Sequence, residues 1–288
     1  MKSKGFSESF FSTYRWIFHA RILREFKNHK DSFTWKKGLE IGGPSDNFSP
    51  KSIVPVYRIA GSVDNCNFAA QTIWSSSIGN EHIFSYQGKE LGRQFICEGT
   101  QLEGIADDTY DFLISSHTLE HIANPIKALH EWKRVIKDGG MLLLLLPHKE
   151  RTFDHWRPVT DLGHLIKDYE MGVNEDDMTH LSEILELHDL SMTPEVGTWE
   201  EVIERSNKNF ENRCLHHHVF TTESAIRVVD YVGFKILSVV NHSPHHIILF
   251  CQKTSSKMLD VVHAENALLL GKEANWRALS CFESDRIS

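Results

Sequence analysis

The chain of 288 residues has few cysteines and no long apolar segment. Its cysteines are scattered and form no C-x-x-C pair, which excludes a disulfide framework and a zinc knuckle. The longest apolar run, residues 141–146, is far too short to cross a bilayer. Residues 1–30 also lack the uninterrupted apolar segment of a signal peptide. We therefore expect a cytoplasmic protein.

Basic side chains are in the minority, with 31 Lys and Arg against 39 Asp and Glu and a net charge of −8. Residues 1–37 nevertheless carry nine basic and three acidic side chains, so the rest of the chain is strongly acidic. Phosphate contacts need clustered Lys and Arg, which argues against nucleic acid as the principal partner. Only the basic arm, residues 1–36, could meet a polyanion or an anionic lipid surface.

Apolar side chains recur at spacings of three and four between residues 9 and 27, which predicts an amphipathic helix with a basic face. These side chains are Phe11, Tyr14, Phe18, Ile22 and Phe26. Two roles are open for this helix: it packs on the domain as a lid or dimer element, or it anchors the protein peripherally to a membrane. The first is favoured.

Strands and helices alternate from residue 37 onward, which predicts an α/β doubly wound, mostly parallel sheet. Asn124 and Pro125 supply a capping residue and a proline at the first helical turn. The all-apolar run 141–146 is typical of a strand covered on both faces. The expected strands are 39–41, 93–97, 111–115, 141–146, 234–240 and 246–252, with helices after residues 124 and 221.

The region before the last helix and two strands does not read as sheet. Residues 148–215 hold 16 acidic and 7 basic side chains and are expected to be helical near 177–188 and 198–205. We therefore predict a catalytic domain over 37–253 with a substrate-binding insertion at 148–215. Residues 254–288 form a tail with one helical candidate, 264–270.

Ligands of an open α/β sheet bind beyond the carboxyl ends of its strands, and several polar residues stand at such places. Gly42 and Gly43 follow the first strand, where glycine lets the backbone approach a ligand closely. Glu40 could accept a hydrogen bond from an amino or hydroxyl group there. Asp64 is expected to end the second strand, where a carboxylate binds a ribose diol.

Residues 108–147 resemble the core of class I S-adenosylmethionine-dependent methyltransferases of the methyltransferase type 11 kind. The matching residues are Tyr110-Asp111-Phe112, Leu119-Glu120-His121-Ile122, Pro125, Leu129, Glu131, Arg134 to Lys137, Gly139-Gly140 and Pro147. The resemblance is looser over 37–107 and resumes from His217-His218-Val219-Phe220 to Gly233-Phe234. In the family's glycine-rich loop, Pro44 and Asp46 replace glycines, and Asp138 replaces the usual proline.

The resemblance implies a Rossmann-like sheet of seven strands and S-adenosylmethionine as the cofactor. Its expected contacts are Glu40, Gly42 and Gly43 with the methionine portion, Asp64 with the ribose, Glu98 and Thr100 with the adenine, and Ser116 and His117 beside the sulfonium.

Methyl transfer to a hydroxyl requires alignment of the two reactants and removal of a proton, for which histidine is suited at neutral pH. His117 is the first candidate base, and His155, paired with Asp154 or Asp161, is the second. The insertion opens on a dense polar and aromatic segment directly after a buried strand. Its expected substrate contacts are His148, Arg151, Trp156 and Arg157, joined by His217 and His218.

No metal site is assigned, because three consecutive histidines at 216–218 cannot all point into one site and their spacing matches no zinc pattern. Asp154, His155, Asp161 and His164 could bind a divalent ion together with the substrate, but this arrangement is less favoured than no metal site.

The sequence therefore predicts a methyltransferase acting on a hydroxyl of a sugar or other small polar acceptor, for example in surface polysaccharide synthesis. A catalytically inactive, methyltransferase-like binding or regulatory protein is the alternative, motivated by Pro44 and Asp46. A nicotinamide-dependent dehydrogenase would share Asp64 and the sheet, but the G-x-G-x-x-G fingerprint is incomplete.

Overall fold

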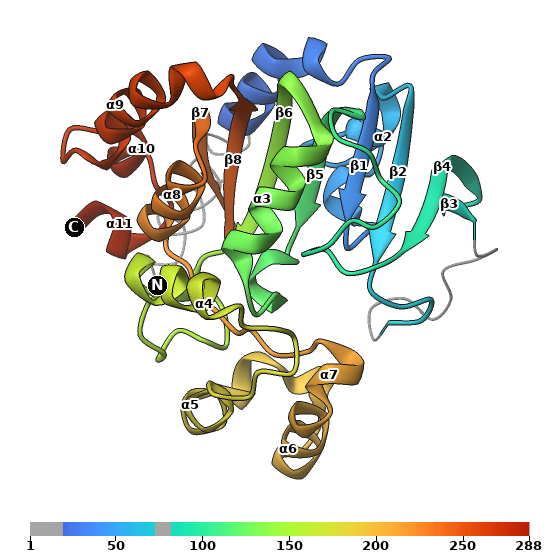
Figure 1. Cartoon of the computed structure of the whole chain (residues 1–288). Coiled ribbons are helices and arrows are strands. Elements are labelled where there is room, and N and C mark those ends of the chain that lie inside the picture. The colour runs from blue at the N-terminus through green and yellow to red at the C-terminus, as the bar shows by residue number, and fades with distance from the viewer. Residues whose placement is uncertain (1–19, 73–81, 288) are drawn as a thin grey trace, which may run out of the picture.

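A mixed sheet runs through the centre of the protein in the computed structural model, which describes residues 20–72 and 82–287 (Figure 1). Eight strands of these residues form it in the order β3-β4-β2-β1-β5-β6-β8-β7. The strands are β1 (Lys37–Ile41), β2 (Ser62–Asn67), β3 (Ile83–Tyr86), β4 (Lys89–Ile96), β5 (Tyr110–Ser116), β6 (Ile136–Pro147), β7 (Phe234–His242) and β8 (His246–Lys253). The predicted doubly wound α/β class is confirmed.

The order of the strands reverses at β1. From β1 the chain proceeds through β2 to β4 on one side and then returns to β5 and β6 on the other, all of them parallel. Of the eight strands, only β3 and β8 run in the direction opposite to the others. Such a reversal opens a crevice beyond the carboxyl ends of β1 and β5, where ligands bind in this class of fold.

The sheet has one strand more than the seven expected. The additional strand β3 pairs antiparallel with β4. Gln87 and Gly88 join the two strands, with φ of 49° and 78°. Positive φ at both central residues is typical of a type I′ hairpin turn, so this two-residue turn was a signal for the missed strand.

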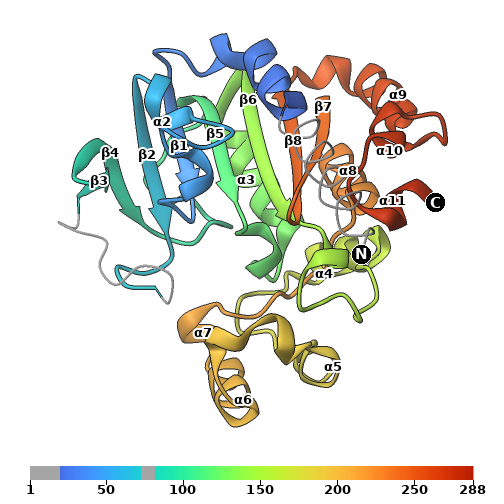
Figure 2. The same ribbon diagram turned by 180° about the vertical axis from the view of Figure 1, so that it is seen from behind.

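Apolar side chains cover both faces of the sheet, as the run at 141–146 predicts. Leu142, Leu144 and Leu146 pack into one cluster, and Met141, Leu143 and Leu145 pack into another on the opposite face. The first face carries α3 (Pro125–Val135), α8 (Thr222–Tyr231), α9 (Leu259–Leu270) and α10 (Asn275–Ala278). The second carries α2 (Val56–Ile59) and a helix at residues 20–29 (Figure 2).

The helix at 20–29 is the described part of the predicted basic arm. Ile22 and Phe26 are buried in the second cluster, as their spacing predicts, whereas Phe11, Tyr14 and Phe18 lie outside the described residues. Arg21 Nη2 donates to the carbonyl of Val239 in β7 at 2.8 Å. This contact supports a helix that packs on the domain. Among residues 20–72 and 82–287, no helix has the length and hydropathy needed to span a bilayer.

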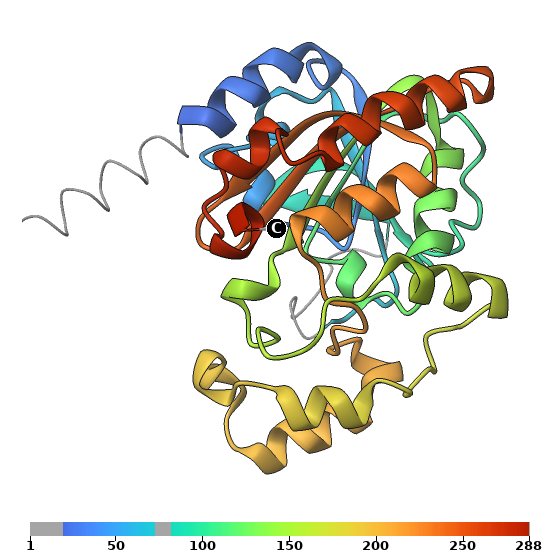
Figure 3. The ribbon, with the colours of Figure 1, turned by 90° about the vertical axis from the view of Figure 1, so that its left-hand side faces the viewer.

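The insertion contains four α-helices within its described residues, α4 (Leu162–Met171), α5 (Leu181–Leu187), α6 (Trp199–Asn207) and α7 (Asn209–Asn212). Helices α5 and α6 fall where the sequence predicts them. Helix α4 was missed, although Asp161 caps its start and Gly172 ends it in the left-handed conformation. Figures 1 and 3 show α5 to α7 beyond the edge at which β1 and β2 end, so the insertion covers that edge.

The tail folds onto the same core as the sheet. In addition to α9, which is longer than predicted, it forms α10 and α11 (Glu283–Ile287) and buries Trp276 and Phe282 in the first apolar cluster. The buried carboxylate of Asp285 accepts hydrogen bonds from Thr222 Oγ1 at 2.6 Å and Asn241 Nδ2 at 2.8 Å. These contacts join the end of the chain to α8 and β7.

Candidate active site

A pocket of about 610 Å³ lies where the strand order reverses. Its walls come from the loops after β1, β2, β4 and β5 and from the insertion. A volume of this size lies within the range of roughly 300–1,000 Å³ that small-molecule sites occupy. The sheet therefore supplies one wall of the pocket and the insertion another.

The loop after β1 is built on glycine, as predicted. Gly42 lines the pocket with φ of +83°, and a Cβ atom there would lie 2.3 Å from Thr118 Oγ1. Both the backbone conformation and the space therefore require glycine. Gly43 is not among the lining residues, but its carbonyl accepts from Asn67 Nδ2 at 2.8 Å. Pro44 lines the pocket at one of the positions where the family has glycine.

Glu40 does not reach the pocket, contrary to its predicted role. It is fully buried, its Oε2 accepts from Tyr57 OH at 2.6 Å, and its Oε1 accepts from the Ser45 backbone N–H at 3.1 Å. Burial raises the pKa of Glu40 to about 8, although the hydrogen bonds from Tyr57 and Ser45 oppose this shift. Glu40 therefore fixes the loop after β1 through Ser45, on the side away from the pocket.

Asp64 is also misplaced by the sequence prediction, because β2 continues to Asn67 and Asp64 lies in its middle. Its carboxylate accepts from Tyr110 OH at 2.9 Å and from the Arg93 backbone N–H at 2.8 Å, and Lys37 Nζ lies 3.2 Å away. It is absent from the pocket wall. Asn67, at the true end of β2, lines the pocket instead.

Of the two residues predicted after β4, Glu98 lines the pocket and Thr100 does not. Thr100 is buried behind the wall. Glu98 Oε1 accepts from Arg213 Nη2 at 2.8 Å, and Arg213 Nη1 lies 2.9 Å from Glu175. Burial raises the pKa of Glu175 to about 7, against the opposing charge of Arg213. These ion pairs tie the sheet loops to the insertion.

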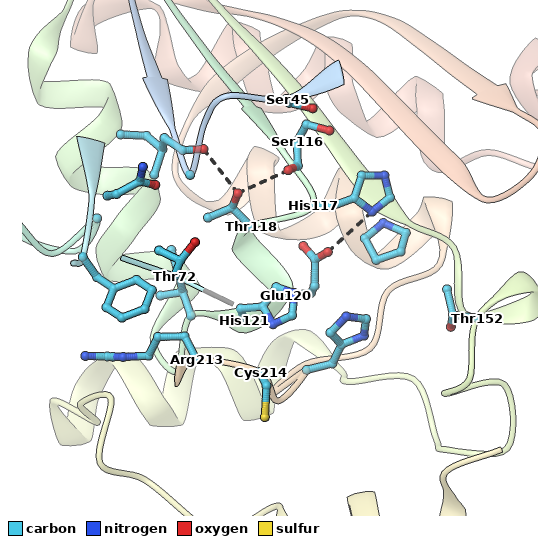
Figure 4. Close-up of a pocket in the computed structure, with 18 of the residues that line it drawn as sticks. Ser45, Thr72, Ser116, His117, Thr118, Glu120, His121, Thr152, Arg213 and Cys214 are labelled. Carbon is cyan, nitrogen blue, oxygen red and sulfur yellow. Dashed lines mark hydrogen bonds and ion pairs between the residues drawn. The ribbon is translucent and has the colours of Figure 1, made fainter. Parts of the chain in front are cut away.

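Polar side chains follow β5 directly, and Figure 4 shows Glu120 between the rings of His117 and His121. Ser116, His117, Glu120 and His121 all line the pocket, which brings together two of the predicted cofactor residues. Neither oxygen of Glu120 accepts a hydrogen bond from the described residues, although the side chain is buried. Burial raises the pKa of Glu120 to about 7.

His117, the first predicted base, is engaged elsewhere. Its Nε2 is hydrogen-bonded to His246 Nδ1 at 2.8 Å, and its Nδ1 lies 3.6 Å from Glu120 Oε1. Burial and the neighbouring His246 hold the pKa of His117 well below its usual range. The ring is therefore neutral at physiological pH but a weak proton acceptor.

A histidine and a carboxylate meet at the insertion wall. His216 lines the pocket, and its Nδ1 is hydrogen-bonded to Asp154 Oδ2 at 2.5 Å. Burial opposes protonation of His216, but the Asp154 charge outweighs it and raises the pKa of the ring. The sequence had singled out Asp154 but paired it with His155, whose Nε2 lies 3.0 Å from Asp189 and which does not line the pocket.

Arg157 was predicted to contact the substrate, but it is buried away from the pocket wall and holds this pair in place instead. It is buried, and its Nη1 donates to Asp154 Oδ1 at 3.0 Å and to the His216 carbonyl at 2.7 Å. The same side chain also reaches Glu183 and the His217 carbonyl. Arg157 therefore joins the start of the insertion to its end.

Only Arg151 of the six predicted substrate residues lines the pocket. His148 is fully buried and stacks on Phe282 with ring centres 3.9 Å apart. Trp156 is 59% exposed and stacks on His155 outside the pocket.

His217 and His218 are also buried outside the pocket wall. His217 is hydrogen-bonded to Asn209 Nδ2, and His218 is hydrogen-bonded to the Ala123 carbonyl. The three consecutive histidines thus point to three different places, as expected.

Phe153 is a pocket residue that the sequence analysis did not name as a contact. Its ring packs against His216 with centroids 4.6 Å apart. A dense segment directly after β6 was the available signal, but which side chains of that segment turn inward depends on the insertion.

Two groups of residues at the pocket have the donor atoms for a metal ion. Glu120, His121 and His216 form the first and all line the pocket, whereas the second joins the lining residues His117 and His245 to His246, which does not line it. Asp154, His155, Asp161 and His164 do not gather at one site, because Asp161 caps α4 and His155 pairs with Asp189.

Solved structures with a similar chain course include a SAM-dependent methyltransferase from Aquifex aeolicus, with 14% identity, a TM-score of 0.42 and coverage of 81% of this chain and 88% of that chain. An S-adenosylmethionine-dependent methyltransferase from Mesorhizobium loti has 10% identity, a TM-score of 0.47 and coverage of 80% and 96%. No curated protein matches the chain. Residues 80–144, which include β4, β5 and α3, match the family model described as a methyltransferase domain. This part of the chain is therefore similar to a methyltransferase domain.

Proposed function

We propose that this protein transfers the methyl group of S-adenosylmethionine to a hydroxyl of a small polar acceptor, such as a sugar. The observation that carries this proposal is the His216–Asp154 pair, because its His216 lines the same pocket as the glycine loop after β1. A hydroxyl acceptor needs a proton acceptor beside the methyl donor, and a pocket lined by both Gly42 and His216 supports this arrangement.

The residues present fit the cofactor. Gly42 lines the pocket with its backbone, and a Cβ atom there would collide with Thr118. Glu120 lines the same pocket with a buried carboxylate that accepts no hydrogen bond from the described residues. When bound, S-adenosylmethionine supplies an electrophilic methyl group on a sulfonium. Gly42 and Ser116 would line its methionine side, Asn67 in place of Asp64 its ribose, and Glu98 its adenine. The Glu120 carboxylate would offset the positive charge of the bound sulfonium, which is expected beside His117.

The insertion would hold the acceptor and take its proton. His216 is the proposed general base, and Asp154 is a positioning residue that orients the ring and stabilises its protonated form. Phe153 offers an aromatic face on which a sugar ring can stack. Trp156 was expected to have this role. Arg151 and Glu195 line the same pocket and supply a donor and an acceptor for hydroxyl groups.

A role in surface polysaccharide synthesis stays part of this proposal. The insertion is acidic, with 16 acidic and 7 basic residues in 148–215, which favours a neutral, hydroxyl-rich acceptor over a phosphorylated one. The test is mass spectrometry of cell-surface glycans and metabolites with and without the gene. We expect one species to lack one methyl group in the absence of the gene.

The base is tested with the purified protein and that acceptor. We expect His216→Ala to lower kcat by about 10²–10⁴-fold, the usual contribution of general base catalysis. S-adenosylmethionine binding should be retained in calorimetry. His130→Ala is the matched control, because His130 lies on α3 outside the pocket wall, with its ring centre 5.3 Å from that of Tyr169. Wild-type turnover in His216→Ala would refute the assignment. Cofactor binding without a methylated product in any extract would favour the inactive binding protein.

A further inference from the structure

Three imidazoles and one carboxylate gather behind the insertion wall, outside the pocket. His164 and Asp168 lie one turn apart on α4, His180 immediately precedes α5, and His218 belongs to the segment before α8. Each side chain offers one ligand atom, and the four atoms lie within 4.8 Å of one another. None of the four residues lines the pocket.

The distances between these atoms are those of metal ligands. His164 Nε2 lies 3.1 Å from His180 Nε2 and 3.1 Å from Asp168 Oδ2. Nitrogen and oxygen ligands at about 2.0–2.1 Å from a tetrahedral zinc ion are about 3.3 Å apart. His218 completes the group, because one of its ring nitrogens lies within 4.8 Å of the other three ligand atoms and its ring centre lies 5.6 Å from that of His180.

Two buried ligand atoms of the cluster, Asp168 Oδ2 and His218 Nδ1, have no hydrogen-bond partner among the described residues. Asp168 is 7% exposed, and its Oδ2 accepts no hydrogen bond from the described residues. His218 is 1% exposed, and its Nε2 is hydrogen-bonded to the Ala123 carbonyl at 3.0 Å. This bond places the ring proton on Nε2, so Nδ1 carries a lone pair, and Nδ1 has no hydrogen-bond partner. Buried polar atoms are rarely left so.

The hydrogen bond from His218 to the Ala123 carbonyl also orients the imidazole ring. Histidines that ligate a metal usually donate their other ring N–H to a carbonyl or carboxylate, which fixes the tautomer and the direction of the lone pair. The main-chain carbonyl of Asp168 is likewise held, since it accepts from Asn124 Nδ2 at 3.1 Å. The His218 side chain is therefore oriented from outside the cluster, and the backbone at Asp168 is held there as well.

We propose that His164, Asp168, His180 and His218 bind one zinc ion with a structural role. Three imidazole nitrogens and one carboxylate oxygen suit zinc, and four protein ligands close a tetrahedral site. Because no coordination position is left open, the ion would serve structure and not the methyl transfer.

The ion would fasten the insertion to the catalytic domain. Helix α4 packs between α3 and α8 on one side, and Figures 1 and 2 show it between α8 and α5. His180 begins the outlying helices, and His218 lies two residues from His216 of the pocket. One ion at this junction would hold three segments that are far apart in the sequence, including the segment that carries the proposed base.

Metal analysis of the purified full-length chain tests the proposal. We expect one zinc ion per chain by mass spectrometric metal analysis, its loss on dialysis against a chelator, and its return when zinc chloride is added. His180→Ala, a change at a half-buried residue, should lose the ion. His263→Ala is the matched control and should keep it, because that half-exposed ring on α9 contacts Asp230 far from the cluster.

A second variant separates this site from the pocket. His216→Ala removes a member of the group formed with Glu120 and His121 but leaves the zinc cluster intact, so it should keep the ion. Loss of zinc in His216→Ala with retention in His180→Ala would overturn the proposal and assign the metal to the pocket. Absence of zinc from the wild-type chain, before and after reconstitution, would overturn it as well.

Two measurements on the wild-type chain remain informative if His180→Ala does not fold. Zinc at a concentration on the order of 100 times its Kd should raise the Tm of the chelator-treated protein by about 5 °C or more. Replacement by Co²⁺ should give the intense visible absorption of a tetrahedral site. An unchanged Tm, or the weak absorption of an octahedral cobalt ion, would contradict the four-ligand site.

Discussion

Replacement of Gly42 by alanine is the sharpest test of the loop that follows β1. The new Cβ atom would lie 2.3 Å from Thr118 Oγ1 and 2.9 Å from Thr118 Cγ2, in a backbone with φ of +83°. The left-handed backbone costs an alanine about 1–2 kcal/mol. Displacing Thr118, whose Oγ1 donates to the Ile41 carbonyl, costs a further 1–3 kcal/mol or so. We expect a loss of about 2–5 kcal/mol in the free energy of unfolding.

Gly104→Ala is the matched control, because Gly104 has φ of +76° and nothing within 4 Å of its Cβ position. It should lose only the backbone contribution, about 1–2 kcal/mol. Urea denaturation measures both changes, and calorimetry measures S-adenosylmethionine affinity. We expect the affinity to fall at least about tenfold in Gly42→Ala and to stay unchanged in Gly104→Ala, a difference of about 1.4 kcal/mol. Equal stability losses together with equal affinities would refute the role given to this loop.

Two further predictions concern buried carboxyl groups. Asp285→Ala leaves the buried donors of Thr222, Asn241 and Ser280 without an acceptor, so it should lower the free energy of unfolding by about 2–4 kcal/mol. Asp260→Ala is the control, because Asp260 is exposed, and it should change the free energy of unfolding by less than about 0.5 kcal/mol in the same urea titration. Glu40, with its pKa raised from 4.5 to about 8, keeps a proton in the folded protein that the unfolded chain releases, so it lowers stability as pH rises through that interval. Glu40→Gln should therefore gain stability relative to the wild type between pH 5 and pH 8, by at most about 1.4 kcal/mol per pH unit, and an identical pH dependence of both proteins would contradict this.

The sheet could be predicted because its signals are local. The apolar run at 141–146 and the capped helix at Asn124 and Pro125 each determine one element without reference to the rest of the chain. The site residue Asp64 was predicted wrongly because the sequence does not show where strand β2 ends. Strand β2 runs three residues past Asp64, and this shift moves the expected ribose contact out of the pocket.

The pocket could be predicted only on the side that the strands provide. Gly42, Glu98, Ser116 and His117 follow strand ends, so topology alone brings them together. The insertion wall depends on contacts between distant residues. Asp154 and His216 are 62 positions apart, and they meet because Arg157 bonds to both.

Histidines were the hardest residues to interpret. Residues 216–218 stand side by side in sequence, yet one lines the pocket, one contacts Asn209 and one joins α4. The spacing from His164 to His218 matches no short metal motif, because the four residues of that cluster come from three separate segments. Only the packing of α4 against α3 and α8 brings them together.

The central claim is that the pocket at the reversal of strand order binds S-adenosylmethionine. Isothermal titration of the full-length chain with S-adenosylmethionine and with S-adenosylhomocysteine tests it most directly, with Gly42→Ala as the pocket variant and Gly104→Ala as its control. We predict that both ligands bind the wild type and Gly104→Ala at one site per chain and that both bind Gly42→Ala more weakly. Absence of binding of either ligand to the wild type would contradict the account.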